Sequence, residues 1–392
     1  MSWLHLLNLV AGASLGMTWL FFVVAARRGL NSMPELAREE YSAPEGAALP
    51  KVSILVPARN EQAMIERSVR SLLAIDFPNY ELIVVNDRSE DRTGEILDRL
   101  REEVGERLVV IHIHELPAGW LGKTHAMWKA TQQATGEWLL FTDADIVHHP
   151  QALRRAVAYA EAEQAAHIVL LPTMEMHSMG ERMMISFFQA MFIFPGHRPW
   201  KVRDPASQDV LGVGAFNMVR RAAYEQIGTY ESMRLSVVDD MRLAEKVKRA
   251  GMRSVAVFGT GLVCLRWAVG ATGVMRNLTK NFFAELKYSV PFVMGAAVAI
   301  LWLHLGPWLG IFFSSGWARA GYAAAMVSLL AIYIGMGRRT KISPAYLLLH
   351  PVATLLMVAT MLISTVLTLG RGGVMWRGTF YPLAELRRSE SR

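Results

Sequence analysis

The stretch "LLFTDADIVHHP", Leu139–Pro150, begins as an apolar run and then places two carboxylates, Asp143 and Asp145, two residues apart. Two such charges repel each other and are costly to dehydrate, so the pair needs either an exposed loop or a positive group between the side chains. A single D-x-D is expected by chance about once in a chain of this length. The surrounding sequence therefore has to decide between the two explanations.

Short apolar runs alternate with helical patterns on both sides of this stretch. Strands are predicted at residues 52–56, 81–85, 108–112, 137–141 and 168–171, and helices at residues 61–73, 92–103, 124–134 and 151–160. This alternation predicts an α/β domain with a mostly parallel sheet wrapped by helices. Such sheets bind ligands at the carboxyl ends of their strands. Those ends carry "PARNE", "NDRSED" and "DAD", so a polar site is expected there.

The composition is too apolar for an ordinary soluble protein of this size. Of the 392 residues 52% are hydrophobic, and the mean hydropathy is +0.24. The net charge is +7, but much of the Lys and Arg flanks apolar segments or lies in the tail. This pattern favours a membrane as partner over a nucleic acid. The single cysteine, Cys264, excludes an intrachain disulfide and any metal site built from cysteines.

Long apolar stretches predict a multi-pass membrane protein. Residues 1–28 hold the first, which at ~1.5 Å per residue can cross a ~30 Å hydrocarbon core. A cleaved signal peptide is the alternative for this segment. Arg27 and Arg28 follow the apolar run and place the next segment, a linker over 29–50, in the cytoplasm. Residues 290–370 hold about three further spans.

The basic tail, residues 371–392, conflicts with this count of spans. One plus three crossings leave the tail outside the cell, whereas its arginines favour the cytoplasm. Two other segments carry membrane-interface patterns. Residues 271–289 form a candidate interfacial helix, and the apolar segment within 183–200 is either interfacial or a buried core helix.

The common nucleotide-binding motifs do not fit the chain. A dinucleotide-binding unit needs G-x-G-x-x-G after the first strand, and Pro57–Gln62 ("PARNEQ") has no glycine. "GWLGKT" (Gly119–Thr124) imitates a P-loop, but position 117, where that motif needs glycine, is Pro117. Both motifs are excluded by their spacing.

Five motifs, taken together and in order, resemble a known family. They are "VSILVPARNE", "ELIVVNDRSEDRT", "GWLGKTHA", "DAD" and "VVDDMRLAEKVKRAG", spread over residues 51–270. The chain resembles the inverting nucleotide-sugar glycosyltransferases of family 2, which have the GT-A fold. The flanking apolar stretches are similar to those of the membrane-bound branch that includes ceramide glucosyltransferases and hopanoid- and carotenoid-associated bacterial enzymes. The resemblance implies a Rossmann-like cytoplasmic domain between one N-terminal and about three C-terminal transmembrane helices, in a bacterial inner membrane.

The resemblance also implies residues that bind the donor. The implied contacts to a nucleotide-sugar come from Pro57, Ala58, Glu61, Asp87, Lys123 and Asp143. Among them, Asp87 would accept a hydrogen bond from the base, typically the uracil of a UDP-sugar. Asp145, together with Asp143, would hold a divalent metal, Mg²⁺ or Mn²⁺. Hard oxygen ligands suit both ions, and such an ion neutralises the charge that grows on the departing diphosphate.

On the acceptor side the resemblance implies a general base and neighbouring contacts. Asp240, the second Asp of "VVDD", matches the catalytic base of the family, because one carboxylate must take the proton of the attacking hydroxyl. Asp239, Arg266 and Trp267 would lie beside it and a lipid would be the acceptor. In related enzymes the stretch around Arg266 reads (Q/R)-x-x-R-W, and Val263 stands at its first position here.

Alternatives remain for these residues and for the function. Asp87, Lys123 and the Asp239–Asp240 pair suit, respectively, a turn, an exposed helix start and an ordinary acidic helix N-terminus. Arg266–Trp267, and the C-terminal stretch "RGGVMWRGTFY", suit membrane anchors. The alternative functions are a processive polysaccharide synthase and a non-catalytic, nucleotide-binding membrane subunit.

Overall fold

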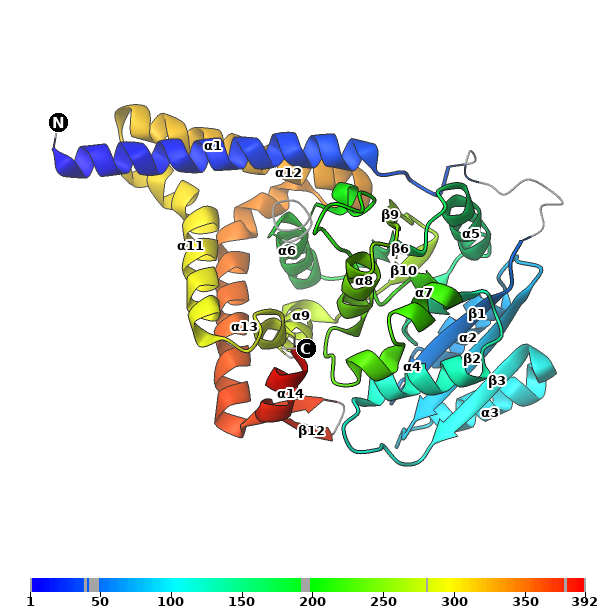
Figure 1. The fold of residues 1–392 in the computed structure, drawn as a ribbon. Coiled ribbons are helices and arrows are strands. Elements are labelled where there is room, and N and C mark those ends of the chain that lie inside the picture. The colour runs from blue at the N-terminus through cyan, green and yellow to red at the C-terminus, as the bar shows by residue number, and fades with distance from the viewer. Residues whose placement is uncertain are drawn as a thin grey trace. The chain divides into compact units, whose positions relative to one another are not determined.

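The computed structural model describes residues 2–38, 41, 49–191, 198–279, 281–376 and 379–390. The chain forms two compact units (Figure 1). Met33–Glu175, Pro199–Arg266 and the chain end Arg388–Arg392 make up the first, which we call the sheet unit. Met1–Ser32, Met176–Arg198 and Trp267–Arg387 make up the second, the helical unit. The apolar segment after residue 176 thus groups with the long helices.

A seven-stranded sheet of order β3-β2-β1-β4-β8-β6-β9 is the centre of the sheet unit. Its strands are β1 (Val52–Ala58), β2 (Tyr80–Asp87), β3 (Leu108–Ile113), β4 (Trp138–Phe141), β6 (His167–Leu171), β8 (Asn217–Arg220) and β9 (Ser254–Phe258). β1 pairs in parallel with β2 and β4, and only β8 is antiparallel to its neighbours within this sheet. The predicted mostly parallel sheet is confirmed; β8 and β9 were not predicted.

Helices follow the strands as the sequence pattern predicts. They are α2 (Ile65–Leu73), α3 (Thr93–Val104), α4 (Gly122–Gln133), α5 (Ala152–Ala162), α7 (Arg221–Gln226) and α8 (Asp239–Arg249), with the short 3₁₀ turns η2 (Gly105–Arg107), η4 (Pro199–Lys201) and η5 (Tyr230–Met233). α2 begins later than residue 61, because the carbonyl of Glu61 closes a turn with the N–H groups of Met64 and Ile65. Apolar side chains of α4, α8 and η5 pack with those of β1, β2 and β4 in one core cluster.

A second, three-stranded sheet of order β5-β10-β7 completes the unit. β5 (Val147–His148) is antiparallel and β7 (Thr173–Met174) parallel to β10 (Val263–Leu265). His148 is 3% exposed in β5, and its burial lowers its pKa to about 4. β10 ends at Leu265, directly before Arg266.

Among the described residues of the helical unit, four helices are long and apolar enough to cross a membrane. The unit consists of α1 (Trp3–Ser32), α6 (Met179–Phe188), α9 (Gly270–Thr279), α10 (Phe282–Glu285), α11 (Val290–Phe313), α12 (Gly316–Thr340), η6 (Pro344–Leu349), α13 (His350–Arg371), the strands β11 (Gly373–Trp376) and β12 (Thr379–Pro382), and α14 (Leu383–Glu390). The candidate spans coincide with α1, α11, α12 and η6–α13, so one N-terminal and three C-terminal apolar helices are confirmed.

α6 explains part of the apolar segment after residue 183. Met184, Ile185 and Phe187 are completely buried, and the Phe187 ring packs on the rings of His304 and His350 at 5.0 and 4.8 Å. Burial within the protein, one of the two interpretations of the sequence, therefore describes this part of the segment. Residues 192–197 lie outside the described residues, and contact of the segment with the membrane interface stays a prediction. "RGGVMWRGTFY" contributes to the antiparallel pair β11–β12, although its residues 377 and 378 also lie outside them.

Candidate active site at the carboxyl ends of the strands

The loops after β1 and β2 are tied to each other. Asn60 accepts a hydrogen bond from the N–H of Glu90 (2.8 Å), and its own N–H donates to Ser89 Oγ (3.0 Å). The N–H of Gln62 donates to Asp91 Oδ2 (3.1 Å). β1 and β2 are adjacent and parallel, so the polar residues of "PARNE" and "NDRSED" meet at one edge of the sheet.

The residues expected at the nucleotide lie along this edge. Pro57 and Ala58 are the buried last residues of β1, and the half-buried Glu61 donates its N–H to Thr93 Oγ1 (2.8 Å). Asp87, the last residue of β2, is 1% exposed. These positions place all four at the carboxyl ends of adjacent strands; their contact with a nucleotide stays a prediction.

Arg88 forms a two-pronged ion pair with its neighbour Asp87. Its Nε lies 2.7 Å from Asp87 Oδ1 and its Nη2 lies 3.1 Å from Oδ2. Arg88 holds a left-handed backbone conformation (φ +52°), which costs a side-chain-bearing residue about 1 kcal/mol. The start of α4 abuts this pair so closely that a Cβ at Gly122 would collide with both side chains. Only glycine fits there, and it brings the next residue, Lys123, to the sheet edge.

Lys123 is the centre of the site. Its ammonium nitrogen lies 2.9 Å from Asp143 Oδ1 and 3.1 Å from Asp239 Oδ1. Burial alone would lower the pKa of Lys123, but Asp143, Asp239 and Asp240 outweigh it and raise the pKa above its ordinary value. The ammonium therefore stays charged and joins the end of β4, the start of α4 and the start of α8.

This ion pair partly answers the question raised by the two acids after β4. Asp143 donates its N–H to the carbonyl of Gly214 (3.0 Å), and a Cβ on Gly214 would collide with the Asp143 carboxylate. The positive group beside Asp143 is thus the Lys123 ammonium, supplied from 20 residues earlier in the chain. Asp145 lies in the turn that follows and is half-buried.

The two aspartates that begin α8 differ in their surroundings. Asp239 is 4% exposed; one carboxylate oxygen faces Lys123, and Oδ2 accepts a long hydrogen bond from Tyr230 OH (3.5 Å). Burial raises the pKa of Asp239 to about 6, against the opposing effect of Lys123 and together with Asp240 and Asp143. Asp240 is half-buried, and its Oδ1 accepts the N–H of Met241 (2.8 Å).

A buried ladder of polar side chains fixes the start of α8. Ser254 Oγ lies 2.6 Å from His167 Nδ1, His167 Nε2 lies 2.5 Å from Asn217 Oδ1, and Asn217 Nδ2 donates to the carbonyl of Asp240 (3.2 Å). The three side chains come from the adjacent strands β9, β6 and β8 and are at most 2% exposed. Burial lowers the pKa of His167 to about 4, so the ladder is uncharged at neutral pH. A Cβ at Gly212 would collide with the same carbonyl, so the chain there also approaches the start of α8 closely.

Sequence analysis missed these supporting residues. His167 and Asn217 lie in short apolar runs, and Tyr230 begins the short 3₁₀ turn η5, so none carries a local motif. The glycines of "LGVGAFN" (residues 211–217) were the one available signal, because glycine recurs where another backbone approaches closely.

The donor set at Asp143 and Asp145 fits a divalent cation of the magnesium type. Among the described residues no group of three or more His, Cys, Asp or Glu is placed to hold an ion. Within the part of the chain that the structure describes, the candidate ligands at this point are the two carboxylates of Asp143 and Asp145. Mg²⁺ usually takes one or two carboxylates and completes its shell with substrate phosphates and water. The site suits an ion that arrives with a diphosphate and is too poor in ligands for a permanent structural metal.

Arg266 and Trp267 are neighbours in the chain that belong to different units, Arg266 to the sheet unit and Trp267 to the helical unit. Arg266 is exposed after β10, and Trp267 is half-buried and packs on Phe188 of α6, with ring centroids 5.0 Å apart. Trp267 also accepts a hydrogen bond at its carbonyl from Asn277 Nδ2 (2.7 Å). Their role on the acceptor side stays a prediction.

Comparisons with known proteins agree with this geometry. Residues 53–228 match the family described as Glycosyl transferase family 2. The 4,4'-diaponeurosporenoate glycosyltransferase of Staphylococcus haemolyticus is 22% identical over 66% of this chain and 68% of its own length. Its counterpart in Staphylococcus aureus is 20% identical over 85% of this chain and 89% of its own length. The beta-monoglucosyldiacylglycerol synthase of Synechocystis sp. is 36% identical, but over 28% of this chain and 23% of that protein.

A solved structure shares the fold. A mannosyltransferase from Pyrobaculum calidifontis, in complex with GDP-Man and Mn²⁺, matches 90% of this chain and 99% of its own, with a TM-score of 0.53 at 21% identity. The fold, the family match and the glycosyltransferase relatives lead to one conclusion: the chain has a GT-A fold, and its residues 53–228 form a glycosyltransferase domain similar to family 2.

Proposed function

We propose that this glycosyltransferase moves one sugar from a nucleotide-sugar, a UDP-sugar, to a lipid acceptor at the cytoplasmic face of a bacterial inner membrane. Relatives named for a carotenoid acid and for a glucosyldiacylglycerol support a lipid acceptor. The four long apolar helices support a place in the membrane. Arg27 and Arg28 at the end of α1 support a cytoplasmic catalytic domain.

The observation that carries the proposal is the position of Lys123 between Asp143 and Asp239. It joins the donor-side acids after β4 to the acid pair that begins α8. A displacement needs both groups at one reacting carbon, with the leaving group and the attacking hydroxyl on opposite faces. With Lys123 between them, the acids after β4 can face the leaving group while the acids at the start of α8 face the attacking hydroxyl.

On the donor side, the chain provides contacts for the nucleotide and a charged end for the diphosphate. Asp87 accepts from the base and is oriented by Arg88, Pro57 and Ala58 contact the nucleotide through their backbone, and Glu61 lies near the ribose. Lys123 fixes the Asp143 carboxylate, so that Asp143 and Asp145 present oxygen ligands together. A Mg²⁺ or Mn²⁺ ion held by these two residues would neutralise charge on the departing diphosphate.

On the acceptor side, Asp240 is the general base. Asp239 is unsuited to this role because it is buried and its carboxylate faces Lys123 and Tyr230. Asp240 is more exposed, and the Ser254–His167–Asn217 ladder fixes its main chain. The acceptor hydroxyl gives its proton to Asp240 as its oxygen bonds to C1 of the sugar, and the bond from C1 to the diphosphate oxygen breaks. One such displacement inverts the anomeric carbon.

Sugar transfer by the purified, membrane-reconstituted protein tests this proposal. The wild type is incubated with a panel of UDP-sugars and bacterial lipid extract, and products are analysed by mass spectrometry. We expect one added sugar per lipid, and we expect Asp240→Asn to lower the rate by about 10²–10⁴-fold. UDP binding, measured by calorimetry, should be unchanged in that variant.

Each alternative function predicts a different result. Polymeric products would identify a processive synthase. UDP binding without transfer from any donor would support a non-catalytic subunit. Full transfer by Asp240→Asn would show that another group is the base.

A further inference from the structure

Two long apolar helices of the helical unit, α1 and α12, run in the same direction. Asn8 Oδ1 near the start of α1 accepts a hydrogen bond from Ser314 Oγ, just before α12 (3.0 Å). Further along, a Cβ on Gly16 would lie 2.7 Å from the carbonyl oxygen of Gly321. The residue numbers of the contacts rise together, so the two helices are parallel (Figure 1).

Parallel packing brings two basic clusters to the same end of the pair. Arg27 and Arg28 lie in the last turns of α1, and Arg338, Arg339 and Lys341 lie at the end of α12. Basic residues at the end of a membrane helix mark the cytoplasmic side. Both helices therefore cross from the outside to the cytoplasm. Two basic clusters at the same end of the pair support this orientation more strongly than either cluster alone.

α11 begins on the cytoplasmic side and ends on the outer side. α9 and α10, which precede it, have 10 and 4 residues and are too short to cross a bilayer. The last residue of α11, Phe313, is followed by Ser314, which binds Asn8 at the outer end of α1. The carbonyl of Leu303 in α11 accepts the Nε1–H of Trp19 in the middle of α1 (2.8 Å), so the second half of α11 is the outward segment that precedes α12, while its first half runs alongside α13.

α13 runs antiparallel to α11 and ends where α11 starts. At its beginning His350 Nε2 lies 3.0 Å from His304 Nδ1, in the second half of α11. Further along, Ser364 Oγ accepts the N–H of Phe283, which precedes α11 (3.2 Å). After α13, Arg387 Nη2 donates to the carbonyl of Tyr288, two residues before α11 (2.9 Å). The tail thus lies at the cytoplasmic end of α11.

We propose that α13 does not cross the membrane. It starts after the cytoplasmic end of α12 and ends beside the cytoplasmic start of α11, so both of its ends are on the same side although it is apolar and 22 residues long. Figure 1 shows the α11–α13 pair running crosswise to the α1–α12 pair. α13 lies in the cytoplasmic leaflet, with acyl chains covering its exposed apolar side chains Leu355, Ile363, Val366 and Leu369.

This arrangement removes the conflict between the number of apolar helices and the basic tail. Three crossings, by α1, α11 and α12, with α13 held in one leaflet, return the arginines after residue 371 to the cytoplasm. It also gives the enzyme an apolar surface in the leaflet whose lipids face the cytoplasm. The inference does not depend on the proposed sugar transfer.

Single cysteines in a Cys264→Ala background test the topology of the full-length protein. Ser315→Cys lies before α12, Ser343→Cys after α12, and Ala384→Cys in α14; all three positions are exposed. Right-side-out membrane vesicles are treated with a membrane-impermeant maleimide before and after permeabilisation. We expect labelling of residue 315 in sealed vesicles, and of residues 343 and 384 only after permeabilisation.

Each arm of the experiment can overturn the inference. Labelling of residue 384 in sealed vesicles would show that α13 crosses. Labelling of residue 343 in sealed vesicles, or protection of residue 315 there, would show that α12 does not run from the outside to the cytoplasm. Wild-type Cys264 in the same vesicles is the reference for a position in the sheet unit and should stay unlabelled until permeabilisation.

Discussion

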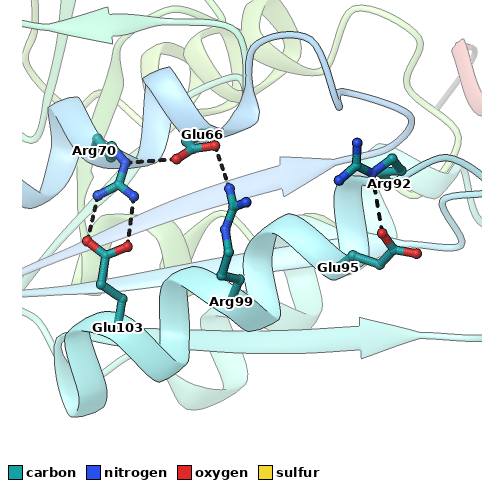
Figure 2. A network of polar contacts seen from close by, with 6 residues as sticks. All are labelled: Glu66, Arg70, Arg92, Glu95, Arg99 and Glu103. Atoms are coloured by element: carbon teal, nitrogen blue, oxygen red, sulfur yellow. Dashed lines mark hydrogen bonds and ion pairs between the residues drawn. The ribbon is translucent and has the colours of Figure 1, made fainter.

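Two groups of charged side chains in the sheet unit each place one cation between two carboxylates, but in opposite surroundings. Figure 2 shows the first, where Arg70 of α2 bonds Glu103 of α3 (2.7 Å) and Glu66 of its own helix (3.0 Å). The second is the Lys123 cluster. The side chains of Arg70 and Glu103 are 44% and 49% exposed, whereas those of Lys123 and Asp239 are 10% and 5% exposed.

The difference in exposure decides what each group does. Water and salt screen the pairs between α2 and α3, so a lost partner there is replaced by solvent. In the Lys123 cluster a lost partner leaves a charge with little access to water. Good geometry alone is therefore a poor guide to importance, since the Arg70–Glu103 pair is as short as any in the active site. Burial distinguishes the chemical centre from a solvated surface network.

Replacing the buried cation should have the largest effect. We expect Lys123→Met to lower the free energy of unfolding by about 3 kcal/mol, because Asp143 and Asp239 then face each other without the cation between them. Sugar transfer should fall by at least about 100-fold. Thermal unfolding in detergent and transfer rates measure the two effects. Lys129→Met is the matched control, because Lys129 is exposed on the same helix.

The comparison would fail if the two lysine variants behaved alike. Retained stability and activity in Lys123→Met would mean that the ammonium is not the centre of the site. Equal losses in Lys129→Met would point to a general effect on α4.

Acid should destabilise the protein through its buried neutral histidines. His148 and His167 have pKa values of about 4 in the folded protein, below the ordinary 6.5, because of burial. Above pH 6.5 both states are neutral. Between pH 6.5 and 4 only the unfolded chain gains protons, so stability falls over that range by about 3 kcal/mol for each histidine.

Unfolding midpoints of His167→Gln and wild type, measured from pH 7 to pH 4, test this effect. The variant should lose stability less steeply than wild type on acidification. His149→Gln is the control, because His149 is exposed, next to the buried His148 and before α5. The curve of this variant should parallel that of wild type. Parallel curves for the His167 variant would contradict a buried neutral imidazole.

Two substitutions at Arg88 separate backbone strain from the ion pair. Both Arg88→Gly and Arg88→Ala remove the bonds to Asp87, but only glycine adopts φ +52° without cost. We expect the glycine variant to be more stable than the alanine variant by about 1 kcal/mol. Donor KM should rise several-fold in both, with kcat retained. Equal stability of the two would show that the loop relaxes, and unchanged KM would show that Arg88 does not orient Asp87.

The sequence predicted the parts of this site that local patterns encode. The buried run before Asp143, the polar ends of β1 and β2, and the acid pair at the start of α8 all follow from periodicity and neighbours in the chain. A positive group beside Asp143 was also predicted, but as a metal ion between Asp143 and Asp145. The structure places the Lys123 ammonium beside both Asp143 and Asp239. These two residues lie 20 and 116 positions after Lys123 in the chain, so local patterns could not predict the contacts.

Long-range contacts explain what the sequence could not predict. β8 inserts between β4 and β6 in antiparallel direction, and this brings Asn217 beside His167 on one side and Asp240 on the other. Nothing in the four residues of β8 signals that insertion. The direction of α13 is a similar case, because hydropathy gives the length of an apolar helix and not which of its ends meets which neighbour.

Breaking the exposed network should have the smallest effect. We expect Arg70→Ala to leave sugar transfer within about twofold of wild type, because its ion pairs are exposed and both partners of Arg70 become solvated. The unfolding midpoint should fall slightly at low salt and match that of wild type at high salt, since screening already weakens the pairs. Arg92→Ala is the matched control, because its pair with Glu95 joins no second helix. A loss in Arg70→Ala as large as in Lys123→Met, and insensitive to salt, would mean that exposure does not decide which charges matter in this protein.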